Sequence, residues 1–163
     1  MRLEFDNPRY CDSFIRLNEQ WITEYFSIEE VDKRLAENPM QIVECGGHII
    51  SLVEVDRVIG VCALFKESDD CFQLARMAVD TKERGKGYGD VLIKAAIGRA
   101  SSRGAKIIYL VSNTVLTPAI SLYRKHGFII REEGQHPVYA RANIIMERSL
   151  QIEGESRVEY TVF

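Results

Sequence analysis

Long apolar runs are absent from this sequence. No segment approaches the roughly 18 uncharged apolar residues that a membrane-spanning helix needs. The first ten residues, MRLEFDNPRY, also lack the basic and then apolar regions of a secretory signal. We therefore expect a cytoplasmic protein without a membrane partner.

Metal-binding patterns are absent as well. The cysteines form no CxxC pair and stand at Cys11, Cys45, Cys62 and Cys71. The histidines are equally scattered, at His48, His126 and His136. Because neither set has the spacing of a zinc site, we expect reduced thiols and no bound metal.

Internal repeats and linkers are missing too, which favours one domain. The chain has 163 residues, of which 46% are apolar and 28% charged, so it has the size and the apolar content of one ordinary domain. We expect this domain to cover residues 1–150. Residues 151–163, QIEGESRVEYTVF, are polar enough for a tail or an extra edge strand.

The charge is unevenly distributed, although the net charge is only −3. Residues 1–71 hold 7 basic and 15 acidic residues, whereas residues 82–125 hold 9 basic and 2 acidic ones. The positive segment favours an anionic ligand and the acidic half a cationic partner, but two solvated faces of opposite sign would look the same. Because the whole chain is acidic, we do not expect nucleic acid as a partner.

Hydrophobic periodicity predicts an α/β (α+β) fold with a mixed, mostly antiparallel sheet of about seven strands and about four helices. The predicted strands are 2–5, 48–55, 58–65, 72–80, 106–112, 127–133 and 139–150. The predicted helices lie within 6–26, 27–38, 91–100 and 118–126. Ser27 with Glu30 has the spacing of a capping box, and Thr117 before Pro118 that of an N-cap.

A glycine-rich loop, RGKGYGD at 84–90, joins the fourth strand to the next helix. A Walker A loop would continue Gly-Lys-Ser/Thr, but Asp90 follows Gly89, and the spacing is GxGxG instead of the GxGxxG of a dinucleotide fold. Glycines at a helix start, with Arg84 and Lys86 beside them, still fit a pyrophosphate. The alternative is a turn that only reverses the chain.

The segment ARMAVDTKERGKGYGDVLIKAA resembles the acetyl-CoA-binding motif of the GNAT N-acetyltransferase family. Arg84, Gly87 and Gly89 fill the family pattern (Arg/Gln)-x-x-Gly-x-(Gly/Ala), and SNTVLTPAISLYRKHGF at 112–128 resembles the family's next motif. The likeness covers about residues 3–150. It implies transfer of an acetyl group from acetyl-CoA to a primary amine, on a sheet that splays between the fourth and fifth strands.

The resemblance also assigns cofactor contacts. It places the pantetheine arm along the main chain of Met77, Ala78 and Val79, and an amide near Val79 beside the thioester carbonyl. It implies a hydrogen bond from Asn113 to the cofactor. It places the pyrophosphate on the amides of Arg84, Gly85, Lys86, Gly87, Tyr88, Gly89 and Asp90.

Tyr123 is the predicted catalytic residue, since the resemblance places it near the cofactor sulfur. Its helical spacing with Ala119 and Leu122 puts the phenol on the inward stripe, where it would serve as general acid or be a buried structural tyrosine.

The general base is not assigned by the sequence. Many family members carry a glutamate where this chain has Gln73, which cannot accept a proton. Glu44, Glu54 and a water chain are the alternatives, and both glutamates are otherwise surface acids. Gln73 also leaves open a second class of function, a CoA-binding sensor without turnover.

The acceptor is the least determined part. Tyr139, Arg141 and Asn143 alternate, so on a strand they would share one face. Arg141 there would suit a carboxylate, which favours an amino acid or peptide-like amine over a plain polyamine, although an arginine at a solvated sheet edge is the alternative. Trp21 and Tyr25, one turn apart, would wall the same small-molecule site unless Trp21 serves the core. The sequence leaves open whether the chain forms a homodimer.

Overall fold

The computed structural model describes residues 1–135, 137 and 140–150, and within them a seven-stranded sheet in the order β1-β2-β3-β4-β5-β7-β6. The strands are β1 (Arg2–Phe5), β2 (His48–Glu54), β3 (Arg57–Ser68), β4 (Cys71–Val79), β5 (Ile107–Ser112), β6 (Ile129–Glu133) and β7 (Ile144–Ser149). The helices are α1 (Cys11–Tyr25), α2 (Glu30–Glu37), α3 (Gln41–Glu44), α4 (Tyr88–Ser102) and α5 (Thr117–Lys125). The mixed, mostly antiparallel sheet is confirmed, and the short α3 is the helix that periodicity did not predict.

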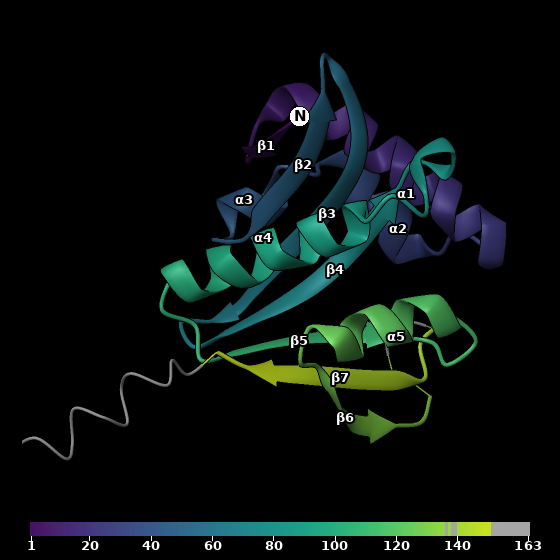
Figure 1. The fold of residues 1–163 in the computed structure, drawn as a ribbon. Coiled ribbons are helices and arrows are strands. Elements are labelled where there is room, and N and C mark those ends of the chain that lie inside the picture. The colour runs from purple at the N-terminus through teal and green to yellow at the C-terminus, as the bar shows by residue number, and fades with distance from the viewer. Residues whose placement is uncertain (136, 138–139, 151–163) are drawn as a thin grey trace, which may run out of the picture.

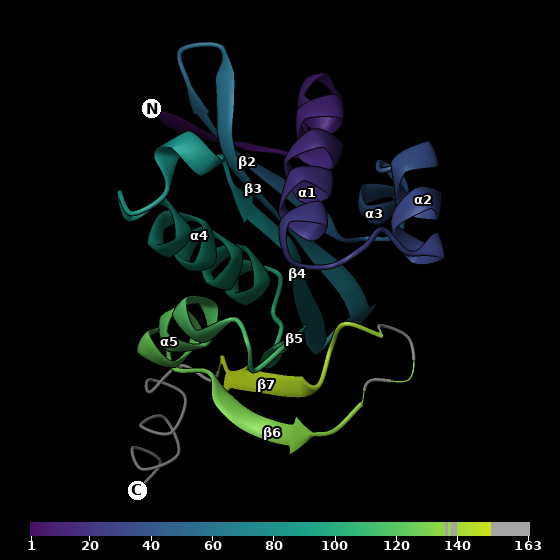
Figure 2. The same cartoon turned by 90° about the vertical axis from the view of Figure 1, so that its right-hand side faces the viewer.

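The helices cover both faces of the sheet. Figure 2 shows α4 and α5 on one face and α1, α2 and α3 on the other. Two apolar clusters fill the two layers, one around Leu92 and Ile93 of α4 and one around Phe14 and Leu17 of α1. Within the described residues, no helix is both long and apolar enough to cross a membrane.

The sheet parts between β4 and β5, as the resemblance implies (Figure 1). These two strands are parallel and pair only from Cys71 to Gln73, opposite Ile107 to Tyr109. Beyond Gln73 these two strands no longer pair with each other, while β5 stays paired with β7 and β4 with β3. The divergence leaves room for a site at the ends of both strands.

A β-bulge bends β4 at this opening. Val61 of β3 pairs with Ala78 and Ala63 pairs with Ala75, so two residues of β4 oppose one of β3. One of the two, Arg76, has a φ of +57°, in the left-handed region that non-glycine residues seldom adopt.

Both predicted helix caps were wrong in position. The capping box of α2 is formed by Glu29 and Asp32, not by Ser27 and Glu30, because the Asp32 carboxylate accepts a hydrogen bond from the Glu29 amide at 2.8 Å. Thr117 is already inside α5, since the Leu116 carbonyl accepts the first helical bond.

The last strand is shorter than predicted. It begins at Ile144 instead of residue 139, and residues 140–143 form a turn and irregular segment before it. Arg141 and Asn143 therefore do not alternate on a strand, so that reason for placing them on one face was wrong. Tyr139 and the predicted tail, 151–163, lie outside the described residues.

Candidate active site

Two cavities meet at the opening between β4 and β5. The outer one, about 520 Å³, lies against the glycine-rich loop and α5, and the inner one, about 100 Å³, lies between the splayed strands and α1. Trp21, Met77, Leu116 and Tyr123 line both. Two molecules, one bound in each cavity, can therefore come into contact beside these four shared residues.

Nearly all the predicted cofactor residues line the outer cavity. It is lined from Met77 to Val79 along β4 and then by the loop from Arg84 to Asp90, with the exception of Lys86. The predicted acceptor residue Tyr25 is half-exposed and lines this outer cavity, not the inner one. The remaining predicted cofactor residue, Asn113, lines the inner cavity.

Two glycines keep the loop open before the first turn of α4. Gly85 and Gly87 have φ values of +79° and +84°, which glycine adopts without strain, and a Cβ at either position would enter open space. Gly87 is also the N-cap of α4 and has no side chain to satisfy the first amides of the helix. An anion at this point would gain backbone donors and the positive end of the helix dipole.

The two basic side chains of the loop already have carboxylate partners. Arg84 donates to both oxygens of Glu24 on α1, and the Lys86 ammonium lies 2.7 Å from Glu83. Glu83 also pairs with Arg57, and Lys86 and Arg57 together hold the pKa of its carboxyl below the usual range. Sequence reasoning did not predict these partners, and the role of Arg84 and Lys86 beside a pyrophosphate stays a prediction.

A second network joins the loop to α5. Asp90, in the first turn of α4, accepts from Lys125 at 2.8 Å and lies 2.7 Å from His126 Nε2. Lys125 and then His126 lower the pKa of Asp90. The pairing fixes α5, and hence Tyr123, against the loop.

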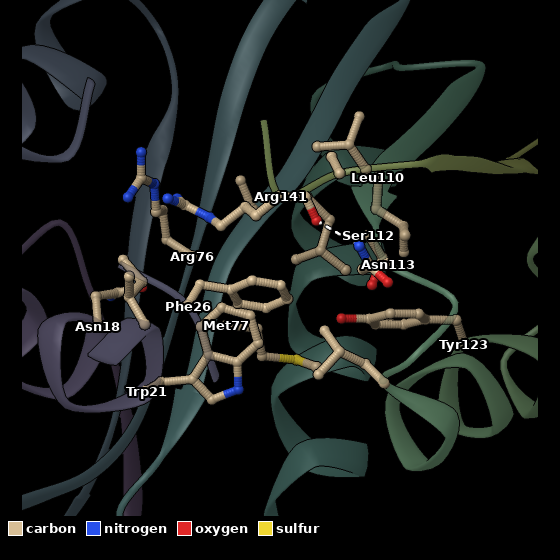
Figure 3. A pocket seen from close by; sticks show the side chains of 16 residues that line it. Asn18, Trp21, Phe26, Arg76, Met77, Leu110, Ser112, Asn113, Tyr123 and Arg141 are labelled. Carbon is tan, nitrogen blue, oxygen red and sulfur yellow. Dashed lines mark hydrogen bonds between the residues drawn. The ribbon is translucent and has the colours of Figure 1, made fainter. Parts of the chain in front are cut away.

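Tyr123 points its hydroxyl into the space where the cavities meet (Figure 3). Burial, with a smaller contribution from Cys62, raises the pKa of its phenol to about 12. The Phe128 ring packs edge-on against it, with ring centroids 6.1 Å apart. Among the described residues, the hydroxyl has no hydrogen-bond partner, so it is a protonated donor facing a cavity.

The inner cavity is lined by both apolar and polar groups. Trp21 and Phe26, whose ring centroids are 6.1 Å apart, form part of its wall together with Leu74 and Leu110. The predicted acceptor residue Trp21, on α1, thus lines the cavity and also packs against Phe26. The polar groups come from Asn18, Arg76, Ser112, Asn113 and Arg141.

The side chain of Asn113 makes two hydrogen bonds within the protein. Its Nδ2 donates to the Arg141 carbonyl at 2.8 Å, and its Oδ1 accepts from the Val115 amide at 3.0 Å. The side chain fixes the turn that carries Arg141. Its predicted hydrogen bond to a cofactor stays a prediction.

Arg141 lines the inner cavity through contacts that the strand hypothesis did not include. Its guanidinium donates to Glu29 at 2.7 Å and to both Asp32 oxygens at 2.8 Å. Arg76 donates to the same Asp32. Burial raises the pKa of Asp32, but Arg141, the Glu29 amide and Arg76 outweigh it and lower that pKa to about 2.

Asp32 and Arg76 were missed by sequence reasoning. Asp32 stands in an ordinary polar helix and gives no signal of its 109-residue link to Arg141. Arg76 did give one, since it is a charged residue inside the apolar run FQLARMAV. A buried charge needs a partner, so a cavity or an ion pair could have been predicted there.

Neither candidate base lies at the cavities. Glu44 is exposed on α3, Glu54 lies 3.9 Å from Arg57, and neither lines the inner or the outer cavity. Gln73 is buried at the last paired position of β4. The described residues contain no group of acidic, histidine and cysteine side chains that could hold a metal ion.

Comparison with known proteins assigns the class. A model of the Acetyltransferase (GNAT) family matches residues 13–128, more than half of the chain, and the chain belongs to that family. Mycothiol acetyltransferase from Corynebacterium glutamicum is 25% identical over 93 residues, which are 57% of this chain and 31% of that enzyme. The chain thus matches about a third of the length of that enzyme.

Solved structures share the fold. A GNAT-family acetyltransferase from Staphylococcus aureus superposes with a TM-score of 0.80 at 19% identity, over 92% of this chain and 100% of that one. A putative acetyltransferase from Salmonella typhimurium, solved with acetyl-CoA, has a TM-score of 0.74 at 18% identity, over 94% and 95% of the two chains.

Proposed function

We propose that this protein is an acetyl-CoA-dependent N-acetyltransferase that acts on a primary amine of a small molecule. The observation that carries the proposal is the Tyr123 hydroxyl, a protonated donor at the junction of two cavities. The outer cavity fits the cofactor, because its glycine loop leaves open space where side chains would otherwise stand. The Salmonella structure with acetyl-CoA bound supports the same assignment for this fold.

In this assignment, the chain holds the cofactor mainly through its backbone. The amides of Arg84 to Asp90 bind the pyrophosphate, and the main chain of Met77 to Val79 runs beside the pantetheine arm. An amide near Val79 polarises the thioester carbonyl. The thioester then lies where Tyr123 and Met77 line both cavities.

The transfer is a direct attack. The acceptor nitrogen forms a bond to the carbonyl carbon while the carbon–sulfur bond breaks, and Tyr123 gives its proton to the departing sulfur. The acceptor ammonium loses one proton to water before the attack and the bonded nitrogen loses a second one after it, and the phenol regains a proton from solvent. Water is the proton acceptor in this scheme because neither Glu44 nor Glu54 lines the cavities.

The acceptor we propose is an amino acid or a peptide-like amine. An inner cavity of about 100 Å³ suits a small molecule, and Arg141 lines it. The test is release of free thiol from acetyl-CoA across a panel of amino acids, short peptides, polyamines and aminoglycosides. Thiol release with at least one amine supports an enzyme. Binding of acetyl-CoA, measured by calorimetry, without release for any amine would instead indicate a sensor.

A further inference from the structure

The inner cavity has a charged side. Arg76 and Arg141 both line it, and Figure 3 shows their guanidinium groups together, across the cavity from the Tyr123 hydroxyl. They come from different elements, the bulge of β4 and the turn before β7. The cavity therefore has a proton donor at one end and two guanidinium groups at the other.

Asp32 holds the two guanidinium groups together. Its carboxylate accepts from Arg76, twice from Arg141 and once from the Glu29 amide. Only 3% of its side chain is exposed, against 8% for Arg76 and 13% for Arg141. Because Asp32 accepts from both Nη1 and Nη2 of Arg141, it fixes the orientation of that guanidinium at the cavity.

Two carboxylates, Asp32 and Glu29, match the charges of the two guanidinium groups. Asp32 is buried, whereas the Glu29 side chain is 25% exposed and partly screened by water, so Glu29 holds Arg141 less strongly than Asp32 does. Arg76 also keeps a left-handed φ of +57°, a conformation that strains a residue with a side chain. A strained backbone that presents a buried charge to a cavity is typical of a binding residue.

We propose that Arg76 and Arg141 bind a carboxylate of the acceptor, and that Asp32 is the positioning residue that holds them. This inference rests on the proposed function and narrows its acceptor to a small molecule that carries both an amine and a carboxylate. With the carboxylate at the arginines, the amine faces Tyr123 and the thioester. A polyamine would instead bring a second ammonium to the two guanidinium groups.

The experiment compares matched acids and amides. Thiol release from acetyl-CoA is measured for the standard L-amino acids and for their carboxamides, with wild type and variants. In parallel, the melting temperature is recorded with CoA and each acid or amide, because this dead-end complex reports binding without turnover. We expect the preferred acid to exceed its amide about 10- to 100-fold in kcat/KM, the range of a charge-assisted pair.

Arg76→Asn is the central variant. Asparagine tolerates the left-handed backbone, so the bulge is kept while the guanidinium is lost. We expect kcat/KM for the acid to fall about 10- to 100-fold and that for the amide to change less than about threefold. Equal losses for acid and amide would overturn the carboxylate site.

Asp32→Asn tests positioning. In this variant we expect KM for the acid to rise about tenfold, with a smaller change in kcat. In Asp32→Glu, which keeps a carboxylate, we expect a smaller rise in KM. Glu37→Gln, an exposed acid on the same helix, is the matched control and leaves both values unchanged. Tighter binding of acids by Asp32→Asn would show that Asp32 competes for the arginines and would overturn its positioning role.

The two proposals fail in different ways. Thiol release that is equal for acids and amides in wild type would leave the transferase intact and remove the carboxylate site. Absence of thiol release, with acids raising the melting temperature in the presence of CoA more than amides do, would keep the carboxylate site and remove the transferase. No preference in either measurement overturns the inference.

Discussion

Arg84 and Glu24 form a two-pronged ion pair, with Nη1 to Oε1 at 2.9 Å and Nη2 to Oε2 at 2.8 Å. It links the proposed phosphate loop to the last turn of α1, the helix whose Trp21 lines both cavities. Glu24 therefore competes with a bound pyrophosphate for the Arg84 side chain. The backbone of the loop therefore supplies the first contacts, and Glu24 lowers the gain from the arginine.

Glu24→Gln should tighten acetyl-CoA binding. Both side chains of the pair are about one-third exposed, and such surface pairs contribute little, so the gain is at most about fivefold in Kd and is smaller at high salt. Titration calorimetry at two salt concentrations measures it. Glu19→Gln, an exposed acid on the same helix, is the control. Weaker binding by Glu24→Gln would show that Glu24 orients Arg84 for the phosphate.

Gly87→Ala should abolish the rise in melting temperature that acetyl-CoA causes. The methyl group enters the open space before the loop and also strains a backbone at φ +84°. Gly104→Ala separates the two effects, because Gly104, just after α4, has φ +81° and open space but does not line the cavities. Both variants should lose about 1–2 kcal/mol of stability. If acetyl-CoA raised the melting temperature of Gly87→Ala and Gly104→Ala equally, the loop would not be part of the cofactor site.

The loop could be predicted from the sequence because its signals are local. Gly87 and Gly89 stand within one short segment at a helix start, and their conformational freedom and the helix dipole act on neighbouring residues. The fold followed in the same way from periodicity. The N-cap of α2 could not be predicted from local sequence, because Ser27 and Glu29 can both cap a helix. The hydrogen bonds between Glu29 and Asp32 decide for Glu29.

The acceptor side could not be predicted in the same way. The contact between Asp32 and Arg141 joins residues 109 positions apart, and no local pattern encodes it. The alternation of Tyr139, Arg141 and Asn143 suggested a strand, but pairing with β5 begins only at Ile144. Arg141 was placed near the acceptor for a wrong local reason, although it does line the inner cavity.

Tyr123→Phe should lower kcat about 10- to 10⁴-fold and leave KM for acetyl-CoA nearly unchanged, because only the proton donor is lost. The ring keeps its contact with Phe128. Since burial raises the pKa of the phenol to about 12, the wild type should keep its donor protonated up to pH 10. Steady-state kinetics and a melting curve check this prediction. Normal kcat in a stable variant would exclude the role.

The stability of the fold should fall in acid through Asp32. Its pKa is lowered from 3.8 to about 2 in the folded chain, so the carboxylate stabilises the fold above about pH 4, and this contribution is lost as the pH falls toward 2. The shift corresponds to about 2 kcal/mol. Urea unfolding between pH 2 and 6 should show a flatter acid limb for Asp32→Asn than for the control Asp12→Asn. If stability fell equally with pH in Asp32→Asn and Asp12→Asn, the result would contradict a stabilising role for the buried ion pair of Asp32.

The most direct measurement of the proposed reaction is a product balance. Wild-type protein is incubated with acetyl-CoA and the best acceptor of the panel, and free CoA thiol and N-acetylated amine are quantified together by mass spectrometry. Direct transfer predicts equal amounts of the two products, and about 10- to 10⁴-fold slower formation of both with Tyr123→Phe. Free thiol without acetylated amine, or neither product although acetyl-CoA binds, would contradict an N-acetyltransferase.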